Sequence, residues 1–223
     1  MSNRISRRSA VAAASGTALF SRVALHAQED TSHTFGDGTV LSWVAPWSNR
    51  GENAVESTLP GSVSLGNDNQ YEFLVSVFDS PGNLTDVANG MLTFLVSDPA
   101  LFTAVGGGSS DLVGADGSTL GKLEYQVYVV SVGGEALGLY FQLVNELQLT
   151  VLVAPVSQFG EGMSSAQSSI SINDVAVFAD ADGADFQQQM VAAVDRLLAG
   201  PAIGGEYTDA LGILHVTWTD DWK

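Results

Sequence analysis

The chain has 223 residues, of which 25 are acidic and 8 are basic, 45% are hydrophobic and none is cysteine. This length and apolar content suffice for a domain with a hydrophobic core that needs no disulfide. A net charge of −17 argues against binding to nucleic acid or to anionic lipid, which both favour a basic surface. The absence of cysteine also excludes thiolate-bound zinc and a cysteine nucleophile.

Residues 1–27 have the pattern of a signal peptide. Basic residues precede an apolar, alanine-rich run at 10–20, and Ala27 offers a small residue for cleavage. The run is too short and too weakly apolar for a membrane span. The paired Arg7 and Arg8 resemble a twin-arginine export signal, which indicates export in a prokaryote, either by secretion or to the cell wall. A general secretory signal and an amphipathic helix that stays on the chain are the alternatives.

Two strands and a helix are predicted in the first half of the remaining chain. Residues 39–44 and 71–78 alternate in polarity, which is typical of strands with one buried face. Residues 84–96 change to the spacing of a helix, which Pro99 ends, and a short helical turn is expected at 100–102. One face of the second strand should present Tyr71, Phe73, Val75 and Val77.

Glycine residues separate the elements predicted in the second half. The run Gly106-Gly107-Gly108 predicts a flexible loop, and Gly133-Gly134 predicts a hairpin turn. Residues 185–198 show the clearest helical pattern, which ends at Gly200-Pro201. The other predicted elements are strands over 120–132, 136–145 and 147–154, a short helix over 156–167, and a strand pair within 170–178.

This order of elements predicts an α+β fold, in which helices pack on an antiparallel β-sheet. Its features are the strand ending in Trp43-x-x-Pro46-Trp47, a helix after 71–78, a meander over 120–154 and a closing helix led by Phe186. In these features residues 34–199 resemble the PsbP-like fold, named after an extrinsic subunit of photosystem II. The resemblance implies an α/β/α sandwich. It implies a scaffold rather than one activity, because that fold serves binding subunits, transport factors and secreted lipoproteins.

The four tryptophans form two Trp-x-x-x-Trp pairs, at 43/47 and at 218/222. The residues before them also match, since Val-Leu-Ser-Trp at 40–43 corresponds to His-Val-Thr-Trp at 215–218. A linker-like run at 200–206 lies between the two. We therefore predict that 207–223 begins a second, truncated repeat, which would need a strand-addition partner to complete its sheet. The alternative is that both strands belong to one domain.

Several catalytic chemistries are poorly supported. Only His33 and His215 remain beyond residue 27, and no Gly-x-Ser-x-Gly motif occurs, which argues against a Ser–His–acid triad and a three-histidine zinc site. A pair of carboxylates for glycoside hydrolysis is available among the 25 acids. Trp47 and Tyr128 are candidate surface aromatics that could hold a sugar, although core positions are the usual place for such residues.

Acidic residues alternate in Asp180-Ala181-Asp182-Gly183-Ala184-Asp185, which resembles part of a calcium-binding loop. Asp180, Asp182 and Asp185 are therefore candidate calcium ligands. The positions that an EF-hand gives to glycine and glutamate hold Asp185 and Val191, so the segment is not an EF-hand. The alternative is that Asp182 or Asp185 caps the helix that follows.

The sequence as a whole predicts an extracytoplasmic, non-enzymatic module that binds a ligand or has a structural role, without an identified cofactor or partner. The alternative function is that of a secreted carboxylate-dependent hydrolase or a carbohydrate-binding protein. A cleft with two close acids of raised pKa would favour the alternative, whereas a sheet filled on both faces would favour the non-enzymatic module.

Overall fold

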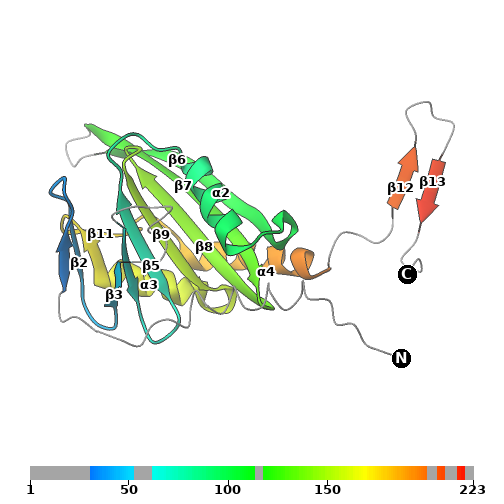
Figure 1. Ribbon diagram of the computed structural model, residues 1–223, viewed down its shortest axis with the longest axis horizontal. Coiled ribbons are helices and arrows are strands. Elements are labelled where there is room, and N and C mark those ends of the chain that lie inside the picture. The colour runs from blue at the N-terminus through cyan, green and yellow to red at the C-terminus, as the bar shows by residue number, and fades with distance from the viewer. Residues whose placement is uncertain (1–30, 53–61, 114–117, 200–204, 209–214, 219–223) are drawn as a thin grey trace.

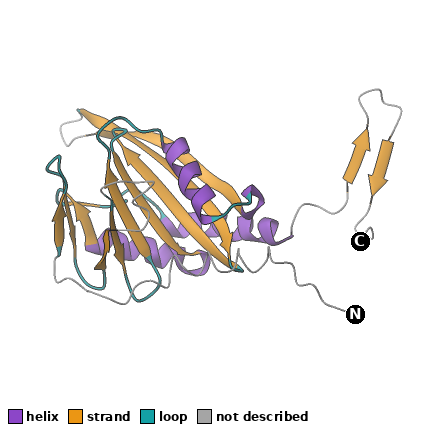
Figure 2. Cartoon of the chain, in the orientation of Figure 1, coloured by secondary structure: helices purple, strands orange, loops and turns teal. Residues whose placement is uncertain are grey.

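The computed structural model describes residues 31–52, 62–113, 118–199, 205–208 and 215–218. The predicted signal peptide, with Arg7 and Arg8, lies outside these residues. Figure 1 shows a large twisted sheet with helices on both of its faces and a smaller sheet beside it. Runs of strands are separated by helices along the described chain (Figure 2). The predicted α+β fold is confirmed.

A seven-stranded antiparallel sheet forms the centre of the molecule, with the strand order β3-β4-β5-β9-β8-β7-β6. Strands β7 to β9 form the predicted meander, β6 extends it at one edge, and β5 joins it by pairing along its whole length with Gln148–Val153 of β9. The strands are β3 (Ser48–Glu52), β4 (Val63–Gly66), β5 (Glu72–Val77), β6 (Phe102–Val113), β7 (Thr119–Val132), β8 (Glu135–Val144) and β9 (Gln148–Pro155).

A four-stranded sheet has the order β1-β2-β10-β11 and joins segments that are distant in sequence. Strand β2 pairs with β1 on one side and with β10 on the other, where Trp43 lies opposite Ile170. Its strands are β1 (Ser32–Thr34), β2 (Val40–Trp43), β10 (Ile170–Ile172) and β11 (Val175–Ala176).

The two faces of the seven-stranded sheet are covered by different elements. Helix α2 (Leu84–Leu95) packs on β7 and β8, and Leu84, Ala88 and Leu92 are its buried residues. We call this side the α2 face. On the opposite side, helix α3 (Phe159–Ser169) packs on β9, and α4 (Gly183–Ala199) packs on β6, β7 and β8. We call this side the α3–α4 face. Two short 3₁₀ helices, η2 (Pro99–Leu101) and η3 (Val156–Gln158), lead into β6 and α3.

The α3–α4 face holds the larger core, which also includes Leu41 and Trp43 from the small sheet. As predicted, Phe73 and Val75 of β5 and Tyr71, which directly precedes the strand, are buried in the same core. The closing helix also packs as predicted, but Met190 and Ala193 are its buried apolar side chains, whereas Phe186 is half-buried. The core of the α2 face consists mainly of aliphatic side chains, contributed by α2 and by β5, β7, β8 and β9.

The predicted loop at Gly106–Gly108 is wrong, because the three glycines lie within β6 and pair with β7. Gly108 lies opposite Tyr125, and a Cβ atom at Gly108 would stand 2.9 Å from the tyrosine ring. The ring therefore occupies the space that a side chain at Gly108 would take. Such glycine–aromatic pairs across strands are a known way to accommodate glycine in a sheet.

The C-terminal strands β12 (Gly205–Thr208) and β13 (His215–Trp218) pair with each other as a two-stranded sheet. In this hairpin Thr208 lies opposite His215, and Gly205 lies opposite Trp218. The β1–β2 hairpin is also antiparallel: Thr34 lies opposite Val40, and the N–H of Trp43 donates to the carbonyl of Thr31. In both hairpins the second strand carries the matching sequence, but the registers differ by one residue, because the paired residues next to the turn are six positions apart in one hairpin and seven in the other.

Candidate functional site

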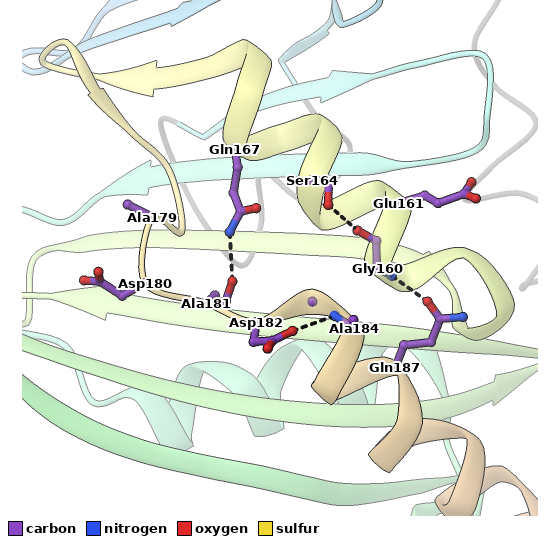
Figure 3. Close-up of a pocket in the computed structure, with 11 residues that line it drawn as sticks. Gly160, Glu161, Ser164, Gln167, Ala179, Asp180, Ala181, Asp182, Ala184 and Gln187 are labelled. Atoms are coloured by element: carbon purple, nitrogen blue, oxygen red, sulfur yellow. Dashed lines mark hydrogen bonds between the residues drawn. The ribbon is translucent and has the colours of Figure 1, made fainter.

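An open hollow of about 800 Å³ lies between α3, the start of α4 and the turn that precedes α4 (Figure 3). Acidic, amide and hydroxyl side chains line it, and the described residues contribute no basic group to its lining. Its polar lining residues are Glu161, Ser164, Gln167, Asp180, Asp182 and Gln187.

Two glutamines build the walls of this hollow. The Nε2 group of Gln167 donates to the carbonyls of Phe178 and Ala181, at 2.8 and 2.9 Å, and so holds the turn against α3. The Oε1 atom of Gln187 accepts from the N–H of Gly160 at 2.9 Å, and its Nε2 donates to the carbonyl of Ser157 at 2.8 Å. These bonds tie α4 to the start of α3, so both amides are structural.

The carboxylates of the hollow do not form a catalytic pair. Glu161 and Asp180 are exposed, and Figure 3 shows their side chains pointing in opposite directions from different elements. The hydroxyl of Tyr71 donates to Oε2 of Glu161 at a distance of 3.4 Å. Burial, and then the charge of Glu161, raise the pKa of Tyr71. The arrangement offers negative charge and hydrogen-bond acceptors rather than an acid next to a base.

Asp182 caps α4, as the alternative to calcium binding expected. Its Oδ1 accepts from the N–H groups of Ala184 and Asp185, both at 3.0 Å. Asp185 instead accepts from Nε2 of Gln189, at 2.7 Å, one turn further along the helix. The described part of the chain contains no group of three or more His, Asp or Glu residues placed to hold a metal ion. The structure therefore does not bring Asp180, Asp182 and Asp185 together as a calcium site.

The two predicted surface aromatics are buried, so that prediction is wrong. Trp47 is 3% exposed, packs edge-on against Phe73, and donates from its indole nitrogen to the hydroxyl of Ser165 at 3.0 Å. Tyr128 is 8% exposed on the α2 face, and its hydroxyl donates to Oε1 of Gln126 at 2.8 Å. Neither ring is available as a platform for a sugar.

The carboxyl group with a raised pKa lies elsewhere. Burial on β5 raises the pKa of Glu72 to about 6, and the charge of Arg50 opposes this shift. Arg50 also donates to the carbonyl of Asn67 at 3.3 Å. Glu72 lines neither of the hollows described here and is matched with a base rather than with a second acid.

A second hollow of about 490 Å³ lies where η3 meets α4 and the start of β8. Its lining is less polar and includes Val156, Val191 and Val194, with Glu135 and Asp195 at its border. Val191 is 47% exposed there, which makes it one of the exposed large apolar residues of the protein. The sequence analysis missed this hollow and the roles of Gln167 and Gln187, because their partners lie 11 to 30 residues away.

Neither the comparison with protein-family models nor the search of the curated proteins finds a match for this chain. Among the described residues, no helix combines the length and the apolar character needed to cross a bilayer.

Proposed function

We propose that this chain is an exported, non-enzymatic binding module, in which the acidic hollow between α3 and α4 takes a cationic ligand. One observation carries this proposal: both faces of the central sheet carry packed cores, whereas the hollow of about 800 Å³ between α3 and α4 is open and lined by acids. The hydrolase and carbohydrate-binding alternatives lose support, because the carboxylates diverge and both candidate aromatics are buried.

The charge of the hollow determines the class of ligand. Glu161, Asp180 and Asp182 supply three carboxylates within a lining that has no described basic residue. Negative potential in a concave surface attracts cations and repels anions. A polyamine or another compound with spaced amino groups fits divergent carboxylates better than a single metal ion, which needs convergent ligands.

Calorimetric titration of the full chain tests this assignment with spermidine, calcium chloride and, as the anionic control, inorganic phosphate. We expect spermidine to bind most tightly. A double substitution, Glu161→Gln with Asp182→Asn, should weaken its binding several-fold, because asparagine keeps the helix cap while the charge is lost. Glu135→Gln with Asp195→Asn, which removes the same charge outside this hollow, is the matched control. Equal loss in both variants, absence of spermidine binding, or turnover of chromogenic glycosides would overturn the proposal.

Export is proposed from residues 1–27 and carries its own test. Replacing Arg7 and Arg8 by lysine should stop export by a twin-arginine route, since that route requires the arginine pair. Export that continues unchanged would leave the general secretory route. A resident N-terminal helix would instead give a chain that is never cleaved near Ala27.

We also propose that the C-terminal hairpin opens a second repeat of the domain. The proposal is supported by the sequence match at 40–43 and 215–218, and by the pairing of each segment with the strand before it as an antiparallel hairpin. Deleting 205–223 should then leave the melting temperature of the domain nearly unchanged, because the deleted strands belong to another unit. A loss of several kcal/mol would show instead that both hairpins serve one domain.

A further inference from the structure

We propose that β6 is a self-association edge, through which two copies of this chain pair their β6 strands antiparallel about a twofold axis at Ser109. The inference starts from the two edges of the seven-stranded sheet, which are β3 and β6. An edge strand presents unpaired N–H and C=O groups, and proteins that stay monomeric protect such edges. The two edges differ in this respect.

Strand β3 carries the usual protections. It has five residues, its register with β4 shifts between Asn49 and Glu52, and its sequence contains one basic and one acidic residue. Shortness, irregularity and charge each discourage the addition of another strand.

Strand β6 has few of these protections. It has 12 residues, it contains neither proline nor lysine, and Asp111 is its one charged residue. Irregular pairing with β7 is confined to Val105 and to the last residues, so that Gly106–Leu112 is a regular stretch. No described strand pairs with the outer side of β6. Residues 107–111 are exposed, and a glycine-rich strand lets a second backbone approach closely.

The charge distribution favours a second copy as the occupant. In a chain with a net charge of −17, two copies repel each other over most of their surfaces, and β6 is a long segment with a single acid. A twofold axis at Ser109 places Gly107 opposite Asp111 and Gly108 opposite Ser110. The two Asp111 residues then stand four residues apart along the paired strands, about 14 Å, which exceeds the screening length of about 10 Å at moderate salt.

Pairing of Gly106–Leu112 with its copy would join the two sheets into one. Antiparallel pairing gives roughly one hydrogen bond per residue, which leaves few of the outer groups unpaired. Residual repulsion between two acidic chains should make the dimer stronger at higher salt, the opposite of an interface held by ion pairs.

The absence of cysteine allows a direct test on the full chain. Ser109→Cys places one thiol on the proposed axis, where opposite Cα atoms of an antiparallel pair lie about 4.5–5.5 Å apart, within disulfide range. Under mild oxidation this variant should become a covalent dimer. The control, Ser168→Cys, places an exposed thiol on α3, and we expect it to remain largely monomeric.

Sedimentation of variants without cysteine completes the test. The unmodified chain should be a dimer that tightens with salt. Ser109→Asp, which puts like charges opposite each other, should weaken it about tenfold or more, whereas Ser168→Asp should not. Melting curves would verify that both variants fold. A chain that stays monomeric at all concentrations, or equal crosslinking of the two cysteine variants, would overturn the proposal.

Discussion

The α3–α4 face and the α2 face bury the same sheet by different means. On the α3–α4 face two helices and a second sheet enclose an aromatic core, in which Tyr140 contacts Phe178 and Phe186 at ring distances of 5.0 and 5.4 Å. On the α2 face one helix of 12 residues covers mainly β7 and β8. The α3–α4 face therefore holds the larger and more aromatic core of the described domain.

Close approach through glycine explains why the α3–α4 face packs so tightly. A Cβ atom at Gly138 of β8 would lie 2.6 Å from the ring of Phe159 and 2.5 Å from the sulfur of Met190. One at Gly183 would lie 2.7 Å from Cβ of Met163. Side chains of α3 and α4 thus occupy the space that a side chain at Gly138 of the sheet would take. A side chain of α3 does the same at Gly183 of α4. On the α2 face, by contrast, Gly90 of α2 has no neighbour within 4 Å of such an atom.

The largest expected effect comes from removing Phe159, which is fully buried on the α3–α4 face. Phe159→Ala should lower the free energy of unfolding by about 3–5 kcal/mol, because it leaves a cavity between α3, α4 and β8. Phe94→Ala on α2 is the control, since Phe94 is 49% exposed and its loss should cost no more than about 0.5 kcal/mol. Urea unfolding measures both, and similar losses would contradict the contrast between the faces.

A pair of glycine substitutions should have effects of opposite sign. Gly138→Ala inserts a methyl group against a buried ring and should destabilise the protein by about 1–3 kcal/mol, although Met190 can move part of its side chain. Gly90→Ala adds a methyl group in open space within a helix and should stabilise by about 0.5–1 kcal/mol. Thermal unfolding of the two variants compares them directly. Two stabilised variants would mean that the contact at Gly138 is loose.

Most elements of both faces are predictable from the sequence, because apolar residues recur with a local period that differs between strands and helices. The strand at 72–77 and the helix at 84–95 were each expected within about two residues of their limits. Gly106–Gly108 was missed because its strand character depends on Tyr125 of the neighbouring strand. Burial of Trp47 was missed for the same kind of reason, since Phe73 and Ser165, which contact it, are distant in sequence.

The candidate site was less predictable than the fold. The acidic run at 180–185 was visible in the sequence, but a cap and a metal site can use the same residues. The hydrogen bonds of Asp182 decide in favour of the cap. What forms the hollow around it is the packing of α3 against α4 through Gln187, which follows no local pattern.

Glu72 lies on β5, in the part of the α2 face that α2 does not cover. It shares this face of β5 with Leu74 and with Ser76, whose buried hydroxyl finds no partner among the described residues. Helix α2 packs on β7 and β8, and in the order of the sheet β8 is two strands away from β5. Polar side chains are thus buried on this part of the face, where the α3–α4 face has Phe73 and Val75 on the same strand.

The pH dependence of stability should reveal this partly buried carboxyl group. Burial raises the pKa of Glu72 from 4.5 to about 6 in the folded state, so the folded chain holds this proton more tightly than the unfolded chain. Its contribution to stability is therefore full below about pH 4.5 and is lost as the pH rises through 6. Glu72→Gln should remove that step and raise the free energy of unfolding at neutral pH by about 1–2 kcal/mol.

Urea unfolding between pH 4 and pH 8 measures the effect, and Glu135→Gln, at an exposed position on β8, is the control for the loss of one charge. If Glu72→Gln instead lowers stability at neutral pH, its interaction with Arg50 outweighs the cost of burial, and this part of the α2 face is held by an ion pair.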